Sequence, residues 1–148
     1  MAHTYVSNLI HCVFSTKERR ETIHADWRAQ LWPYAGGIAR KNGFQALAVG
    51  GTGNHLHALL SLPSTLSIAK ALQLIKGGSS KWIHDSCRAR LFEWQDGYAA
   101  FSVSRSNLKA TAEYIERQAE HHKRRTFEEE YLALLRKHGM PVDEFTFG

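Results

Sequence analysis

Apolar residues recur along this chain with two different spacings, which predict strands and helices in alternation. Alternating or continuous apolar stretches bounded by Gly, Pro and polar residues predict strands over residues 5–15, 44–50, 54–62 and 98–103. The second and third strands are expected to form an antiparallel hairpin across a glycine-rich connection. Apolar residues three or four positions apart predict helices over residues 25–42, over residues 68–86, around Tyr114, and from Thr126 to Lys137.

This order of elements, βαββαβ followed by further helices, defines a fold class. It is typical of an α+β sandwich of the ferredoxin-like or RNA-recognition-like kind. We therefore expect an antiparallel sheet with helices on one face and extra C-terminal helices.

Side chains that can bond free backbone groups mark where several helices begin. Ser67 is expected to cap the helix over 68–86, and Ser106 to cap the helix that carries Tyr114. Thr126 followed by Glu129 has the spacing of a capping box. Pro33 and a following pair of glycines leave the segment 25–42 open between one helix and two short helices with a kink.

The composition indicates one globular domain spanning residues 1–148. The tail at 142–148 ends in Phe145 and Phe147 and is expected to dock on the surface of this domain.

The charge and the absence of certain segments narrow the class of protein. Nineteen Lys and Arg against fourteen Asp and Glu give a net charge of +5, which is compatible with a nucleic-acid partner. No apolar run is long enough to cross a bilayer, and the first residues lack the pattern of a signal peptide, so we expect a cytoplasmic protein with no membrane partner. Cys12 and Cys87 have no metal-binding spacing and are expected to be reduced structural thiols.

Two histidines separated by one apolar residue, His55-Leu56-His57, lie inside the third predicted strand. Because side chains alternate along a strand, both imidazoles share one face, whereas Leu56, Ala58, Leu60 and Leu62 project from the other face into a core. Such a pair offers two nitrogen ligands on a fixed scaffold, which is half of a divalent-metal site. Taken alone, such a pair on a strand is more often structural than metal-binding.

Tyr114 and Gln118 are four residues apart in a strongly helical stretch, so they are expected on one helix face, one turn apart. This face is offset from the apolar stripe of the same helix, which leaves the tyrosine free to face a site. A phenol can act as a nucleophile, and an amide oxygen can ligate a metal. With the two histidines, these residues predict a metal-assisted attack of tyrosine on phosphorus.

On these residues the chain resembles the single-tyrosine HUH transposases of small bacterial insertion sequences of the IS200 type. His55, Leu56 and His57 match the histidine, hydrophobe, histidine motif, and Tyr114 with Gln118 matches the family's nucleophile and third metal ligand. The segments 14–17 and 74–81 are also similar to the family. One residue departs from the pattern, because the family usually has aspartate directly before the first histidine and this chain has Asn54.

The resemblance implies a DNA transposase that cleaves and rejoins single-stranded DNA at hairpin-flanked ends. A divalent ion, Mg²⁺ or Mn²⁺, would be held by His55, His57 and Gln118, and Tyr114 would form a 5′-phosphotyrosine and release a free 3′-hydroxyl. The resemblance also implies a homodimer in which the tyrosine helix of one protomer completes the histidine site of the other.

Two other functions remain open at this point. The first is a domesticated, catalytically weak protein of the same fold that binds hairpin DNA or RNA, an alternative raised by Asn54. The second is a metal phosphoesterase that uses the histidines alone. A histidine-triad nucleotide hydrolase is disfavoured, because the next position of the alternating series is Leu59.

Several basic residues are candidates for contact with DNA phosphates. The basic run 121–125 follows Gln118 and is compatible either with a DNA backbone contact or with a solvated helix end. Trp82, Trp94 and Tyr98 could stack on unpaired bases or pack in the core. Segment 76–81 lacks the spacing of a phosphate-binding loop, so no nucleotide cofactor is expected. The candidate DNA-binding residues are Lys17, Arg19, Arg20, Lys76, Lys81, Lys123, Arg124 and Arg125.

Overall fold

The computed structural model describes residues 2–143 and 146–147. Its strands are β1 (Leu9–Ser15), β2 (Gln45–Gly51), β3 (His55–Ser61) and β4 (Ala99–Val103). Its α-helices are α1 (Ala25–Lys41), α2 (Ile68–Ser86), α3 (Leu108–Glu116), α4 (Gln118–His121) and α5 (Phe127–Lys137), and short 3-10 turns cover Lys17–Arg19 and Arg105–Asn107. The predicted order of elements is confirmed.

Within the described residues the strands form one antiparallel sheet in the order β2-β3-β1-β4. The hairpin of β2 and β3 is confirmed, and β1 pairs centrally with β3 and β4. The first strand is shorter than predicted, because pairing begins at Leu9, whereas Tyr5 and Val6 are exposed. This is the expected ferredoxin-like α+β fold.

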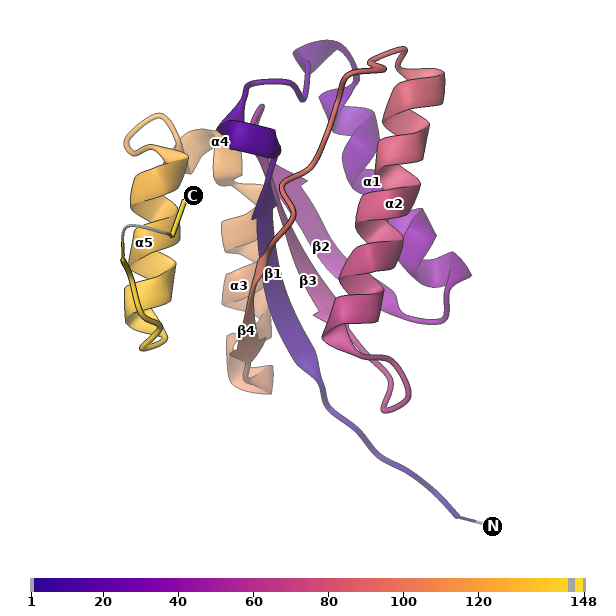
Figure 1. Cartoon of the computed structure of the whole chain (residues 1–148). Helices are drawn as coiled ribbons and strands as arrows, with labels where there is room; N and C mark the ends of the chain where they lie inside the picture. Colours follow the sequence, from indigo (N-terminus) through magenta and orange to yellow (C-terminus); the bar gives the residue numbers. More distant parts are fainter. Residues whose placement is uncertain (1, 144–145, 148) are drawn as a thin grey trace.

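One face of the sheet carries the main apolar core, beneath α1 and α2 (Figure 1). Leu56, Ala58 and Leu60 of β3 are fully buried there, as their alternation with the histidines predicts. Leu72 and Ile75 face this core from α2, whose first turn is capped by the predicted Ser67, since its hydroxyl accepts a hydrogen bond from the backbone N–H of Lys70. Helix α1 runs unbroken through Pro33, so of the two interpretations the single helix is observed.

The additional C-terminal helices cover the other face of the sheet, so the sheet lies between two helical layers (Figure 1). Helix α3 packs on β2 and β3, with Ile115 buried against Ala48 and Leu59. Helix α5 packs Phe127 against Val13 and Phe101. Its predicted capping box is present: the Thr126 hydroxyl accepts from the backbone N–H of Glu129, and the Glu129 carboxylate accepts from the backbone N–H of Thr126.

Two local predictions about the helix that carries Tyr114 are wrong. Ser106 does not cap it, because Ser106 lies inside the 3-10 turn Arg105–Asn107 and its hydroxyl pairs with that of Ser104. The helix also does not continue to Gln118, since Arg117 has φ −103° and ψ 23° and separates α3 from α4. Gln118, the first residue of α4, nevertheless stays beside Tyr114: its side-chain N–H donates a hydrogen bond to the Tyr114 carbonyl oxygen at 3.3 Å.

The tail docks as predicted where it is described. The Phe147 ring lies 5.8 Å from the ring of Tyr131, and the guanidinium of Arg19 lies 5.0 Å above Phe147. Phe145, the other predicted docking residue, lies outside the described residues.

Candidate metal and tyrosine site

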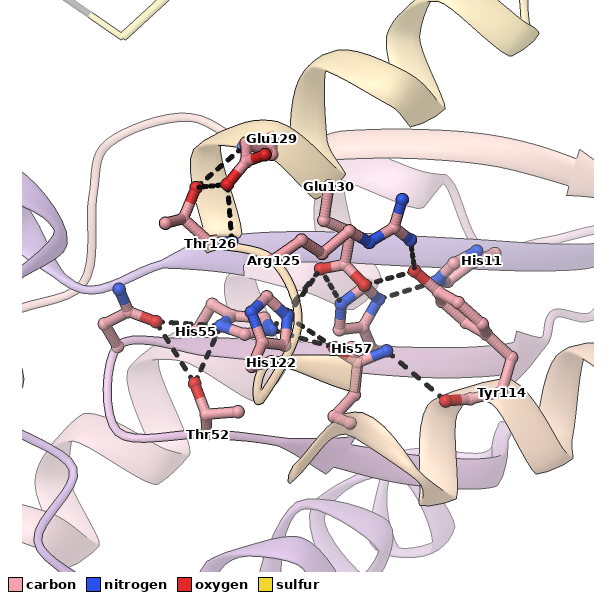
Figure 2. Close-up of polar contacts among 12 residues, drawn as sticks. His11, Thr52, His55, His57, Tyr114, His122, Arg125, Thr126, Glu129 and Glu130 are labelled. Carbon is pink, nitrogen blue, oxygen red and sulfur yellow. Dashed lines mark hydrogen bonds and ion pairs between the residues drawn. The ribbon is translucent and has the colours of Figure 1, made fainter. Parts of the chain in front are cut away.

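The two histidines of β3 lie on the face of the sheet covered by the C-terminal helices, and both are fully buried. His57 pairs through its Nδ1 with Nε2 of His11 on β1, at 2.8 Å. His55 places its Nδ1 2.9 Å from Oδ1 of Asn54 and 3.1 Å from the hydroxyl of Thr52. Each ring is therefore fixed by one nitrogen, and its Nε2 points toward the helices (Figure 2).

Helix α3 can approach the sheet closely because Gly50 of β2 has no side chain. A Cβ at this position would lie 2.3 Å from the carbonyl oxygen of Ile115, which is backbone and cannot rotate away. Glycine here sets the depth at which α3 lies, and with it the position of Tyr114, the residue before Ile115.

The structure brings the predicted residues together within one chain. Oε1 of Gln118 lies 3.1 Å from Nε2 of His55, so the third predicted ligand reaches the first. The Tyr114 ring lies edge-on to His57, with ring centroids 5.9 Å apart. Gln118 is buried, whereas Tyr114 is partly exposed.

Two further residues belong to this group that the sequence analysis did not identify as ligands, His122 and Glu130. Oε1 of Glu130 lies 3.0 Å from Nε2 of His57 and 3.1 Å from Nε2 of His122, and the latter nitrogen is also 3.1 Å from Oε1 of Gln118. Ligand atoms of His55, His122 and Glu130 all lie within 4.8 Å of one another. His122 had been placed in a basic run, and Glu130 interrupts the apolar face of α5 beside Phe127 and Tyr131. A carboxylate on the inner face of an amphipathic helix is a signal that could have been noticed.

Glu130 also contacts the tyrosine. The Tyr114 hydroxyl donates a hydrogen bond to Oε2 of Glu130, while Arg125 donates to the Tyr114 oxygen at 3.1 Å (Figure 2). One carboxylate thus joins the tyrosine to the histidines.

Burial sets the protonation states of the site. Desolvation, reinforced by the neighbouring His57, lowers the pKa of His55 to about 3 and that of His11 to about 3, so both rings are neutral at neutral pH. Burial alone would raise the pKa of Glu130, but the hydrogen bonds from His122 and His57 outweigh it and hold the pKa below its usual range. Burial and the hydrogen bond to Glu130 raise the pKa of Tyr114. Neutral imidazoles beside an ionised carboxylate are the protonation states that metal binding requires.

The donor set fits a divalent cation. The Asn54 amide N–H donates to the Arg19 carbonyl oxygen, at 3.5 Å, so its oxygen faces Nδ1 of His55 and the ring proton belongs on Nδ1. The lone pair on His55 Nε2 then faces two acceptors, Gln118 Oε1 at 3.1 Å and Glu130 Oε1 at 3.6 Å. The lone pairs of His55 Nε2, Gln118 Oε1 and Glu130 Oε1 repel one another when no proton or cation lies between them. A divalent cation among the three atoms would be coordinated by all of them and would remove this repulsion.

The candidate DNA-binding residues differ in their surroundings. Lys17, Arg19 and Arg20 make ion pairs with Glu93, Glu128 and Glu18. Lys76 donates to the carbonyl oxygens of Gln95 and Gly97. Lys81, Lys123 and Arg124 are exposed, whereas Arg125 contacts Tyr114. Of the aromatic candidates, Trp94 is buried in the core, Trp82 is half-buried and stacks on Tyr34, and Tyr98 is exposed.

Among the residues that the structure describes, none of the helices has the length and apolar character needed to cross a membrane. The cysteines are free thiols, Cys12 buried and Cys87 half-buried.

Comparison with known proteins identifies the class. The family described as "Transposase IS200 like" matches residues 4–118, so the chain belongs to the IS200-like transposase family. It is 25% identical, over 129 residues, to the transposase for insertion sequence element IS200 of Salmonella typhimurium, covering 83% of this chain and 84% of that one. The corresponding Salmonella typhi transposase is equally similar.

Solved structures support the same fold. A Deinococcus radiodurans R1 protein, described as a transposase candidate, superposes with a TM-score of 0.62 at 22% identity, covering 80% of this chain and 96% of its own. A REP-associated tyrosine transposase bound to a REP hairpin superposes with a TM-score of 0.60 at 15% identity, covering 82% of this chain and 73% of its own. The protein is therefore a member of a DNA transposase family with the expected fold.

Proposed function

We propose that this transposase cleaves and rejoins single-stranded DNA at hairpin-flanked ends through a 5′-phosphotyrosine on Tyr114. The observation that carries the proposal is the position of Glu130, which bonds the Tyr114 hydroxyl with one oxygen and contacts His57 and His122 with the other. The side chain of Glu130 thus links the proposed nucleophile directly to two of the histidines.

A divalent metal, Mg²⁺ or Mn²⁺, would be held by His55, His57 and Gln118, with His122 and Glu130 within reach of the same centre. Mn²⁺ tolerates imidazole ligands better than Mg²⁺ does. When bound, the ion supplies Lewis-acid polarisation of the scissile phosphate.

The chain's own residues would do the rest of the chemistry. Gln118 ties the centre to the tyrosine backbone, since its N–H donates to the Tyr114 carbonyl oxygen. Tyr114 attacks phosphorus in line and the 3′ oxygen leaves. The covalent linkage keeps the energy of the phosphodiester bond, so the reverse reaction rejoins DNA ends without a nucleotide cofactor.

The partner we propose is DNA that folds into imperfect hairpins near its ends. The similar REP-associated transposase was solved bound to a REP hairpin, and this chain's charge of +5 favours a polyanion. Lys17, Arg19, Arg20, Lys76, Lys81, Lys123, Arg124 and Arg125 remain candidates for its phosphates. We also propose a homodimer, as the family resemblance implies; in the single chain, the Tyr114 ring already lies against His57.

A labelled single-stranded hairpin oligonucleotide, incubated with the protein and Mn²⁺ and run on a denaturing gel, tests this function. We expect a covalent protein–DNA adduct that disappears in Tyr114→Phe and persists in Tyr131→Phe. Tyr131 is a suitable control because it lies in the same layer but packs against Phe127 and Phe147. An adduct that survives in Tyr114→Phe contradicts the proposal.

The same assay separates the other two functions. Hairpin binding without an adduct in the wild type indicates a non-cleaving DNA- or RNA-binding protein of this fold, which Asn54 favours because it places no negative charge beside His55. Hydrolysis that is intact in Tyr114→Phe indicates a phosphoesterase that uses the histidines alone.

A further inference from the structure

The polar groups that contact the Tyr114 hydroxyl come from the part of the chain that follows the family match. The match ends at residue 118, whereas Arg125 and Glu130 lie beyond it, in the loop before α5 and in α5 itself. The family pattern supplies the nucleophile but not the groups that surround its oxygen.

The phenolic oxygen lies between an acceptor and a donor. It donates its hydrogen to Glu130 Oε2 and accepts from Nη2 of Arg125 at 3.1 Å (Figure 2). A guanidinium placed on a phenolic oxygen stabilises that oxygen most when it carries negative charge, because charge-assisted hydrogen bonds are stronger than neutral ones.

Arg125 differs from its neighbours in the basic run. Lys123 and Arg124 are exposed, as expected for a solvated helix end, whereas Arg125 is half-buried with its guanidinium on the tyrosine. The run therefore contains two kinds of cation. Lys123 and Arg124 are exposed and can contact a DNA backbone, whereas Arg125 contacts the phenolic oxygen of Tyr114.

The surroundings of Tyr114 disfavour negative charge on its oxygen. The side chain is half-buried and its oxygen lies against the Glu130 carboxylate, so a phenolate there would face a second anion in a poorly solvated place. In the rejoining step, Tyr114 must leave phosphorus as an oxygen that carries negative charge. A fixed cation at that oxygen lowers the barrier of this step without first having to reorganise.

We propose that Arg125 is a catalytic residue that stabilises negative charge on the Tyr114 oxygen, chiefly in the rejoining step. This inference rests on the proposed function. In cleavage, the Tyr114 O–P bond forms, and the P–O3′ bond breaks with its electron pair moving to the 3′ oxygen. The phenolic proton passes by way of Glu130 to water, and the 3′ oxygen takes a proton from water. In rejoining, a 3′-hydroxyl attacks phosphorus and gives its proton to water, the O–P bond to Tyr114 breaks, and the electron pair moves to the phenolic oxygen. Arg125 holds that oxygen until it takes a proton from water by way of Glu130.

The test uses preformed adduct and follows rejoining to a saturating 3′-hydroxyl strand in single-turnover experiments. We expect Arg125→Gln to slow rejoining by roughly tenfold to a hundredfold, the range for loss of a charged hydrogen bond. Arg125→Lys should recover part of the rate, because it keeps the charge but not the guanidinium geometry. Arg40→Gln, which removes an exposed charge at the end of α1 on the other side of the sheet, should leave the rate at saturation unchanged.

A second measurement separates catalysis from structure. Replacement of Tyr114 by fluorinated tyrosines makes the phenol a better leaving group, and we expect this to accelerate rejoining much more in Arg125→Gln than in the wild type. An equal dependence on phenol acidity in the two proteins would overturn the proposal, as would a defect that disappears at saturating DNA, which indicates a backbone contact. A wild type that forms no adduct would refute the proposed function instead, which keeps the two failures distinct.

Discussion

The two faces of strand β3 are equally buried but carry opposite kinds of side chains, apolar on one face and polar on the other. Leu56, Ala58 and Leu60 face α1 and α2 and are fully buried among apolar side chains. His55 and His57 face α3, α4 and α5 and are also fully buried, but among an amide, a carboxylate and other imidazoles. Burial alone therefore does not identify a core. One face stabilises the fold through apolar contacts, whereas the other is a polar cluster that remains paired only through a network of hydrogen bonds.

The comparison predicts its largest effect at His55. Replacement of His55 by Ala removes a ligand from the proposed metal centre, and we expect adduct formation to fall by about a thousandfold or more, since Lewis-acid stabilisation amounts to several kcal/mol. The rate of adduct formation, measured in single-turnover experiments with Mn²⁺ for the wild type and for His55→Ala, tests this prediction.

Leu60→Ala, on the opposite face of the same strand, is the matched control. It should lower the free energy of unfolding by about 2–5 kcal/mol while the folded protein keeps its rate. A rate loss as large in Leu60→Ala as in His55→Ala would show that the faces are not separate in function.

The second prediction concerns the seating of α3. Gly50→Ala places a Cβ 2.3 Å from the Ile115 carbonyl oxygen, so α3 must move away from β2 and carry Tyr114 with it. Displacement of a reacting group by about 1 Å can reduce a rate about a hundredfold, and we expect a loss of that order.

Gly77→Ala is the control for that change. Among the described residues, nothing lies within 4 Å of a Cβ at Gly77, which is in α2 on the other side of the sheet. Its rate should be unchanged and its stability slightly raised. Wild-type adduct formation in Gly50→Ala would contradict the close seating of α3.

A third prediction sharpens the polar face at Asn54. In the present structure, Nδ1 of His55 lies 2.9 Å from the amide oxygen of Asn54. Asn54→Asp puts a carboxylate oxygen in that place, which makes Nε2 of His55 more basic and therefore a stronger metal ligand. We expect Mn²⁺ affinity, measured by calorimetry, to rise about tenfold or more. Asn42→Asp, an exposed substitution of equal charge at the end of α1, should leave it unchanged. An equal affinity in the wild type and Asn54→Asp would show that Asn54 does not act through His55.

The last prediction is a pH dependence of stability, which is small over any single pH unit. In the folded protein the pKa of His11 is lowered from 6.5 to about 3, so the unfolded chain binds more protons between these values, and stability falls as pH drops through this window. Each such histidine contributes a slope of about 1.4 kcal/mol per pH unit. Urea unfolding with a chelator present, at a series of acidic pH values, should show a slope that His11→Gln reduces by about this amount. An unchanged slope would mean that His11 is protonated in the folded protein.

The fold and one half of the candidate site, namely the shared face of His55 and His57 and the one-turn spacing of Tyr114 and Gln118, follow from local periodicity in the sequence. Alternation along β3 separates Leu56 and Leu60 from His55 and His57 without any knowledge of the rest of the chain. Helical spacing placed Tyr114 near Gln118, although the break at Arg117 and the start at Leu108 depend on packing that periodicity does not encode.

The second half of the site could not be predicted in this way. His122, Arg125 and Glu130 reach Tyr114 and the histidines only because α5 folds back over the sheet, and no spacing in the sequence specifies that return. Arg125 looked like its neighbours in the basic run, and only its contact with Tyr114 distinguishes it.

The most direct test of the account is to map the covalent adduct. Trypsin cleaves after Lys109 and Arg117, so residues 110–117 form a peptide that contains Tyr114 and no other tyrosine. After reaction with a single-stranded hairpin oligonucleotide and nuclease trimming, mass spectrometry should find this peptide carrying a 5′-linked nucleotide, with a free 3′-hydroxyl on the released strand. Cleavage that leaves this peptide unmodified, or a nucleotide attached to a different residue, would contradict the account.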